Sequence, residues 1–211
     1  GSFNLTRYCK YDSAGPSVYF DYHQLTNDIK PIVRMMDNVI DNTTYPLKEQ
    51  LEEAVDKRRM GLGITGFANA CSFLGYRYGS PESLEFLEKV MTTLRDWAYM
   101  TSIDLAKEKG WFPAFRRDEY CQGEFIKTLP LDIQADIHKY GIRNSHLLSI
   151  APTGTISLWA DNISSGIEPV FEHAYMRNVY MPDGTIKKFY LDDYAYHEWG
   201  LTGEVSGDVR V

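Results

Sequence analysis

One stretch of the chain, residues 151–157 with the sequence APTGTIS, has the residue types of an anion-binding turn. A proline restricts the turn, a glycine lets the backbone approach a ligand closely, and hydroxyl residues stand where a helix would begin. Amides in the first turn of a helix point outward, and the helix dipole favours a negative charge there. The sequence therefore predicts a phosphate site. Its candidate residues are Pro152, Thr153, Gly154, Thr155, Ile156 and Ser157.

The same stretch also has a simpler interpretation, which the residues leave open. A Thr or Ser N-cap would satisfy the first amides of the helix and bind no ligand. Residues 162–169, NISSGIEP, form a polar turn that ends in an isoleucine and the proline-flanked Glu168. An isolated acid in such a turn is more typical of a loop or a cap than of a catalyst.

A second motif, GLGITG at residues 61–66, matches the pattern GxGxxG. Dinucleotide binding requires a hydrophobic strand directly before the motif and an acid about 20 residues later, at the end of a second strand. Here a charged helix end, EEAVDKRRM, precedes the motif, and Glu85 lies inside a helical pattern. We therefore reject a dinucleotide site and interpret the glycines as a close-packed turn around a short strand, MGLGI.

The cysteines and histidines indicate no metal or nucleophile site. Cys9, Cys71 and Cys121 are an odd number without a CxxC pair, so neither a disulfide framework nor a structural zinc site is predicted. This cysteine usage is typical of a reducing cytoplasm. The five histidines lack metal-ligand spacing, and each is expected to be solvated or part of the core.

Helices and short strands must position these residues. Apolar residues at three- and four-residue spacing predict helices, with Pro31 in the first turn of the first helix and with Ser80 and Gly110 bounding the longest one. The predicted helices cover residues 26–40, 46–59, the residues before Gly75, 81–109 and 130–139. The predicted strands cover residues 3–8, 17–21 and 146–151, with a hairpin around Asp183-Gly184. Strands separated by long helices indicate an α/β fold with mainly parallel strands.

The composition excludes several classes of protein. A net charge of −7 argues against binding along a nucleic-acid backbone. No apolar run approaches the roughly 20 residues of a membrane span, and no signal peptide is visible. The chain length of 211 residues suits one compact domain or a large piece of a longer protein. The final polar residues are expected to fray.

Five blocks, in order along the chain, resemble the large catalytic subunit of ribonucleotide reductases, and the adenosylcobalamin-dependent class II form most closely. The blocks are GSFNLTRY at 1–8, DNVIDNTTYPL at 37–47, RRMGLGITGFANA at 58–70, RNSHLLSIAPTGTISLWADNISSGIEPVF at 143–171 and DGTIKKFYLDDYA at 183–195. The fourth block is the most specific. Several independent motifs at family spacing make chance agreement a poor explanation.

The resemblance implies a fold and an activity. The fold is a ten-stranded α/β barrel of two half-barrels, and residues 1–211 would form, as a single fragment, most of the second half. The activity is that of a ribonucleoside-diphosphate reductase, which replaces the 2′-hydroxyl of a ribonucleotide by hydrogen through radical chemistry. Adenosylcobalamin is the implied cofactor, and a thioredoxin-type protein the implied reductant.

The resemblance carries over binding residues but no catalytic residue. In the family, the thiyl-radical cysteine lies in an Asn-x-Cys-x-Glu motif just upstream of the part matched by Gly1, and the redox cysteines lie outside the matched region. Cys9, Cys71 and Cys121 occupy none of these places. Only residues 152–157 are carried over, because they match the family segment whose backbone and hydroxyls hold the substrate phosphates.

We therefore expect a reductase fragment that is inactive alone and is completed by upstream and downstream sequence. The start at Gly1-Ser2 favours a cut or processed chain over a separately encoded piece or an interrupted gene product. An open half-barrel leaves strand edges unpaired, so we expect self-association, a dimer, or binding to the rest of the barrel. The alternatives are a phosphate- or nucleotide-binding module without chemistry and a structural assembly protein. Class I or II, and a diphosphate or triphosphate substrate, stay open.

Overall fold

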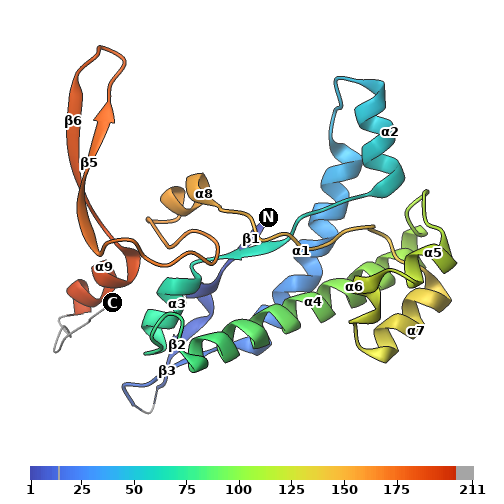
Figure 1. Ribbon diagram of the computed structural model, residues 1–211, viewed down its shortest axis with the longest axis horizontal. Helices are drawn as coiled ribbons and strands as arrows, with labels where there is room; N and C mark the ends of the chain where they lie inside the picture. Colours follow the sequence, from blue (N-terminus) through green and yellow to red (C-terminus); the bar gives the residue numbers. More distant parts are fainter. Residues whose placement is uncertain (14, 203–211) are drawn as a thin grey trace. The chain divides into compact units, whose positions relative to one another are not determined.

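The computed structural model describes residues 1–13 and 15–202 (Figure 1). These residues form two compact units that are interleaved along the chain. The first unit holds residue 1 with residues 21–63 and 86–150, and the second holds residues 2–20, 64–85 and the described residues from 151 on. The expected fraying concerns residues 203–211, which lie outside the described part. That the whole chain is one domain fragment stays a prediction.

The first unit is helical, and its core lies on one face of each long helix. In α1 (Tyr22–Asn42) Leu25, Ile29 and Val33 are fully buried at four-residue spacing. The longest helix, α4 (Pro81–Lys109), belongs to this unit from residue 86 on and buries Leu94 and Ala98. The shorter helices are α2 (Lys48–Lys57), α5 (Arg117–Cys121), α6 (Glu124–Lys127) and α7 (Leu131–Tyr140).

Both predicted ends of α4 are confirmed, whereas the predicted start of α1 is wrong. The amide of Ser83 donates to the Ser80 hydroxyl, and Gly110 ends the helix in a left-handed conformation with φ +84°. The first helix begins at Tyr22, because the Asp21 carboxylate caps it by accepting from the amide of Gln24. Pro31 therefore lies inside the helix and not in its first turn. Its exposed position allows water to satisfy the carbonyl that its missing amide leaves free.

The second unit contains the described strands, apart from Gly63 at the start of β4, together with a 3-10 helix and three short α-helices. β2 (Cys9–Tyr11) pairs antiparallel with β3 (Val18–Phe20), and β5 (Ala174–Tyr180) pairs antiparallel with β6 (Ile186–Asp192). The second pair is a twisted two-stranded ribbon (Figure 1), and its turn at Gly184, φ +80°, confirms the predicted hairpin. The other elements are β1 (Ser2–Asn4), the 3-10 helix η1 (Leu5–Tyr8), β4 (Gly63–Thr65), α3 (Phe67–Phe73), α8 (Gly154–Trp159) and α9 (Tyr194–Thr202), with β1 beside β4.

The predicted strand over residues 3–8 is wrong beyond Asn4. The Asn4 side-chain oxygen accepts from both the amide and the hydroxyl of Thr6, at 3.1 and 2.7 Å. This local bonding turns the chain into η1 and buries Leu5 and Tyr8 on the same side of the turn. Alternation of apolar and polar residues therefore reflects a capped 3-10 turn here, because the asparagine competes with the strand ladder for backbone donors.

The predicted strand over residues 146–151 is reduced to one parallel bridge, between Leu62 and Leu148. The amide of Leu62 donates to the carbonyl of Leu147, and the amide of Ser149 donates to the carbonyl of Leu62. At the next step the backbones approach so closely that an ideal Cβ on Gly63 would lie 2.2 Å from the Ser149 carbonyl oxygen. The pairing is short because the chain turns away after Ile150, and it depends on the glycine.

Neither a membrane-spanning helix nor a metal-binding cluster occurs among residues 1–13 and 15–202. None of their helices is long and apolar enough to cross a membrane. Within the same residues, no cluster of three or more His, Cys, Asp and Glu side chains is placed to bind a metal ion.

Candidate functional site

The predicted phosphate turn lies in the second unit, where residues 151–153 lead into α8. Thr153 precedes the helix in the left-handed conformation, with φ +57°. A β-branched residue seldom adopts this conformation, which costs on the order of 1–3 kcal/mol. The strain therefore has to be offset by contacts of Thr153.

The first turn of α8 presents three backbone amides without a hydrogen-bond acceptor among the described residues, those of Gly154, Thr155 and Ile156. The amide of Ser157 is already used, because it donates to the carbonyl of Thr153 at 2.9 Å. Free amides at the start of a helix are the donors that an anion needs. An ideal Cβ on Gly154 would meet no atom within 4 Å, so the space on the side-chain face of this residue is open.

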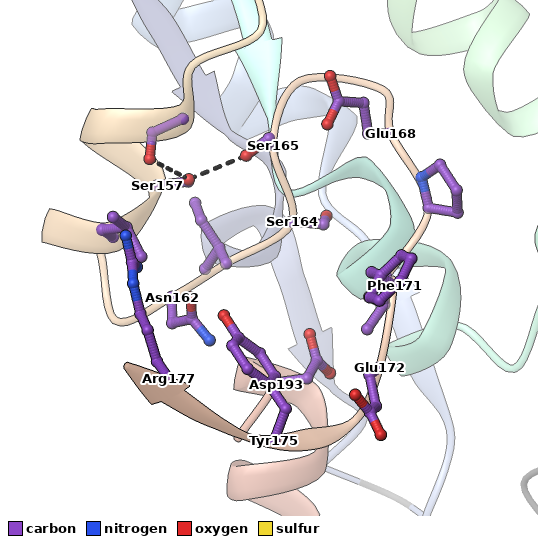
Figure 2. A pocket seen from close by; sticks show the side chains of 15 residues that line it. Ser157, Asn162, Ser164, Ser165, Glu168, Phe171, Glu172, Tyr175, Arg177 and Asp193 are labelled. Carbon is purple, nitrogen blue, oxygen red and sulfur yellow. Dashed lines mark hydrogen bonds between the residues drawn. The ribbon is translucent and has the colours of Figure 1, made fainter. Parts of the chain in front are cut away.

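Ser157 is buried and braces the turn. Its hydroxyl donates to the carbonyl of Gly154 at 2.9 Å, so the hydroxyl of Ser165, 3.0 Å away, must donate to it (Figure 2). Both protons that Ser157 could offer to a ligand are thus used inside the loop. Its part in phosphate binding stays a prediction, and the free amides of residues 154–156 are the stronger candidates.

Beside this turn lies a cavity of about 470 Å³. Residues of the turn, the loop that follows α8, β5 and the start of α9 line it (Figure 2). The lining residues are Gly154, Ser157, Leu158, Asn162, Ile163, Ser164, Ser165, Glu168, Pro169, Val170, Phe171, Glu172, Tyr175, Arg177 and Asp193. The lining thus combines apolar and aromatic side chains with hydroxyls and charges, as in pockets for small polar ligands.

The charged side chains that line the cavity differ in whether protein groups already bind them. Asp193 is buried and accepts from the side-chain amide of Asn69 at 2.6 Å and from the amides of Ala195 and Tyr196. Arg177, Glu168 and Glu172 line the cavity without an ion pair among the described residues. Arg177 is the one basic side chain among the lining residues, and it can add a charged donor to the amides of the turn.

The glycine motif at 61–66 is occupied by protein. The strand β4 lies inside the motif, and the start of α3 is filled by the loop after α8. The amide of Gly66 donates to the carbonyl of Ser164 at 2.7 Å, and the amide of Asn69 donates to the Ser164 hydroxyl. A phosphate would have to displace these bonds, which agrees with the rejection of a dinucleotide site.

The loop itself also needs a glycine. Gly166 has φ +51°, and a Cβ there would lie 2.8 Å from the carbonyl oxygen of Ala151. The sequence patterns singled out neither this glycine nor Thr65, Asn69 and Arg177. For Asp193 a signal existed, because an aspartate directly before a helical pattern is an N-cap candidate.

The described histidines show no catalytic arrangement. The two ring nitrogens of His173 are buried without a hydrogen-bond partner in the described part, and the ring stacks on Tyr196 at 6.0 Å. His197 lies 3.1 Å from the carboxylate of Asp192 at an exposed position. The stacking of His173 is typical of packing and not of proton transfer.

All three cysteines are free thiols, and burial raises the pKa of each. The pKa reaches about 12 for Cys9, where the nearby Cys71 adds to the effect of burial, and about 12 for Cys71 itself. The thiolate is the reactive form, so these thiols are poorly suited to redox chemistry at neutral pH.

We expect Cys9 and Cys71 to react with iodoacetamide at pH 8 about a hundredfold more slowly in the native chain than in urea. Cys121 should be slowed less, because it is less buried. Mass spectrometry of quenched samples measures the three rates, and the urea-unfolded chain is the control. Native labelling of Cys9 at the unfolded rate would contradict the assignment of a half-buried, inert thiol.

The chain matches the family model described as ribonucleotide reductase, barrel domain, over residues 1–194. A vitamin B12-dependent ribonucleoside-diphosphate reductase of Thermoplasma acidophilum is 37% identical over 179 residues, which cover 85% of this chain and 21% of the relative. The ribonucleoside-diphosphate reductase subunit alpha of Chlamydia muridarum is 32% identical over 213 residues, 90% of this chain and 20% of the relative. The ribonucleoside-diphosphate reductase large chain of Neurospora crassa is 29% identical over 188 residues, which cover 81% of this chain and 20% of the relative.

The chain thus spans about a fifth of the length of the curated relatives that it matches. The family model covers the turn, the cavity and both compact units up to the first residue of α9. This match confirms the resemblance found in the five blocks, together with the α/β class that it implies. The chain belongs to the ribonucleotide reductase barrel-domain family.

Proposed function

We propose that this chain is part of a ribonucleoside-diphosphate reductase and supplies the loop that holds the substrate phosphates. The observation that carries the proposal is the turn at residues 151–157, which lies within the matched region and opens three free amides beside the cavity. The relatives named above are reductases of this kind. The reaction replaces the 2′-hydroxyl of a ribonucleotide by hydrogen.

In this proposal the residues of the chain bind and orient the substrate. The amides of residues 154–156 donate to phosphate oxygens, and Arg177 adds a charged donor at the cavity wall. Glu168 and Glu172 accept from ribose hydroxyls, because an ionised carboxylate offers only acceptors. The thiols that such chemistry needs lie outside this sequence, so we propose that the chain is inactive alone.

A binding module without chemistry is the alternative from a different class, and it is not favoured. The relatives carry the name of a reductase, and the match extends through both units of the chain and not only through the turn. A phosphate-binding module would need to resemble the family only around residues 151–157.

We propose adenosylcobalamin as the cofactor of the complete enzyme, and the names of the relatives are its sole support. Those of Thermoplasma acidophilum and Mycobacterium tuberculosis are named vitamin B12-dependent, whereas those of the Chlamydia species are not. The cavity of about 470 Å³ is too small for a corrin ring with its adenosyl group, and neither histidine nor cysteine lines it. The residues of this cavity therefore do not fit adenosylcobalamin, and none of them is assigned to it.

The proposed partners are the ribonucleotide, a thioredoxin-type reductant and the rest of the barrel. Large apolar side chains around the turn support a protein partner, because Trp159 is 90% exposed and Phe171 fully exposed. A second copy of the chain is an equally suitable cover for these side chains. We place the enzyme in the cytoplasm, because its cysteines are free thiols.

The test of the phosphate loop is Gly154→Val. A side chain at this position meets open space in the fold but projects beside the free amides, so it should exclude a phosphate while the chain stays folded. We expect the affinity of the chain for pyrophosphate, measured by calorimetry, to fall at least about tenfold, since one charge-assisted hydrogen bond is worth about 1.5–3 kcal/mol. The melting temperature should change by no more than a few degrees.

The matched control is Gly200→Val, at a helical glycine of α9 that also faces open space. It should leave the affinity for pyrophosphate unchanged. Equal affinities of the Gly154→Val variant and the unmodified chain would show that the turn is only a helix cap, which was the simpler interpretation.

A further inference from the structure

The strained conformation of Thr153 raises the question of what holds it. The residue is half-buried, and its left-handed backbone sets the direction of the three free amides that follow. Its backbone carbonyl accepts only from Ser157, which is part of α8 itself. The anchoring to the rest of the second unit therefore has to come from its side chain.

The hydroxyl of Thr153 is the middle of a hydrogen-bond chain with one direction. The amide of Gly166 donates to the Thr153 hydroxyl at 2.8 Å, and the Thr65 hydroxyl donates to the carbonyl of Ser164 at 3.0 Å. An amide can only donate and a carbonyl can only accept. The hydroxyls of Thr153 and Thr65, 2.9 Å apart, must therefore be joined by the proton of Thr153.

The far end of this hydrogen-bond chain is rigidly held. Thr65 is buried at the end of β4, and the carbonyl of Ser164 also accepts from the amide of Gly66. The fully buried Asn69 fixes the same residue, because its side-chain oxygen accepts from the amide of Ser164 at 2.6 Å. Hydrogen bonds aligned in one direction polarise and strengthen one another, so Thr65 transmits this rigidity to Thr153.

We infer that Thr65 is a positioning residue for the proposed phosphate loop, acting through the hydroxyl of Thr153 to hold the free amides of residues 154–156 in their binding direction. The inference rests on the proposed function, because it concerns the same amides. It assigns to Thr65 no contact with the substrate. The hydroxyl of Thr65, within the GxGxxG motif at residues 61–66, supports the site through its hydrogen bond with Thr153.

The experiment compares three variants of the 211-residue chain. Thr65→Val removes the hydroxyl and keeps the branched shape, and Thr65→Ser restores the hydroxyl. Thr101→Val removes an equally buried threonine hydroxyl from α4, one that donates only to the carbonyl of Trp97. Calorimetry with pyrophosphate gives the affinity, and the Cα and Cβ chemical shifts of Thr153 report the sign of its φ angle.

We expect Thr65→Val to lower the affinity for pyrophosphate about fivefold, the effect of one lost hydrogen bond, and to move the Thr153 shifts away from left-handed values. Thr65→Ser should restore both, and Thr101→Val should alter neither, although it loses a buried hydrogen bond too. Unchanged Thr153 shifts in Thr65→Val, or changed shifts with unchanged affinity, would overturn the inference.

The two proposals fail in different ways. If the unmodified chain does not bind pyrophosphate, the phosphate loop is wrong, and the link between Thr65 and Thr153 is judged by the chemical shifts alone. Should Thr65→Val not fold, Thr65→Ala removes the same hydroxyl without the added methyl group, and the same outcomes decide.

Discussion

Replacing Gly63 by alanine is expected to destabilise the chain by at least about 3 kcal/mol, a large part of the 5–15 kcal/mol that a typical domain has. The added Cβ would lie 2.2 Å from the carbonyl oxygen of Ser149, which belongs to the backbone and cannot rotate away. The two segments must therefore separate. Separation breaks the Leu62–Leu148 bridge and its hydrogen bonds.

Two other glycines are graded controls for this prediction. A Cβ on Gly61 would lie 3.0 Å from the Cβ of Ser149, a contact that a movement of a few tenths of an ångström relieves, so Gly61→Ala should cost about 1 kcal/mol. Gly154→Ala meets no atom and should be close to neutral. Urea unfolding followed by circular dichroism gives the three free energies of unfolding. A cost for Gly63→Ala no larger than that for Gly61→Ala would contradict the close approach.

Replacing Asp37 by leucine is expected to cost about 3–5 kcal/mol, because it removes the buried partner of Arg58 and leaves this cation with the partly exposed Asp41, 2.7 Å away, as its partner. The carboxylate of Asp37 is completely buried, and it accepts from the Arg58 guanidinium at 2.8 Å and from the Asn144 side chain at 3.0 Å. Arg143 lies 3.3 Å from its other oxygen. Arg58 is itself buried and left-handed, with φ +45°, so it cannot easily turn to solvent.

The control is an ion pair of similar length on the surface. Lys57 and Glu53 are 2.6 Å apart and exposed, so Glu53→Gln should cost less than about 1 kcal/mol. Replacing both Asp37→Leu and Arg58→Met should recover part of the loss, since no cation that has lost its buried partner then stays at residue 58. Equal costs for Asp37→Leu and Glu53→Gln would contradict the buried network.

The same carboxylate predicts a pH dependence. Burial by itself raises the pKa of Asp37, but the hydrogen bonds from Arg58 and Asn144 and the charges of Arg58 and Arg143 outweigh it, so the pKa lies below its ordinary value. Because the pKa of Asp37 is lower in the folded chain than in the unfolded chain, the ionised carboxylate stabilises the fold. This contribution is complete above the pKa of an aspartate in the unfolded chain, about 3.9, and it is lost as the pH falls through the pKa of the folded state. The difference in stability between the unmodified chain and Asp37→Leu should therefore be constant at neutral pH and shrink below about pH 4.

Local signals in the sequence predicted those elements whose ends carry their own stabilising groups. Ser80 and Gly110 bound α4, and the Asp183-Gly184 dipeptide marks the hairpin, because a cap or a positive φ acts within a few residues. The sequence also placed a turn at residues 151–157 where a helix begins, and the family resemblance pointed to its phosphate site. Pattern also predicted the strand over residues 17–21, which is present as β3, but it was insufficient for residues 3–8 and 146–151. Residues 3–8 alternate like a strand, but the Asn4 side chain turns residues 5–8 into the 3-10 helix η1.

Only the tertiary structure decided what holds the site together. Thr65 lies 88 residues before Thr153 and 99 before Ser164, yet one hydrogen-bond chain joins the three. Likewise, Gly63 is indispensable only because the backbone at Ser149 comes to rest against it. Composition, periodicity and short motifs describe neighbours along the chain, so they determined here the helices and the turn, and the five sequence blocks carried the resemblance to the family. Which distant hydroxyl receives a proton, and which glycine leaves room for a carbonyl, depends on contacts that exist only after the chain has folded.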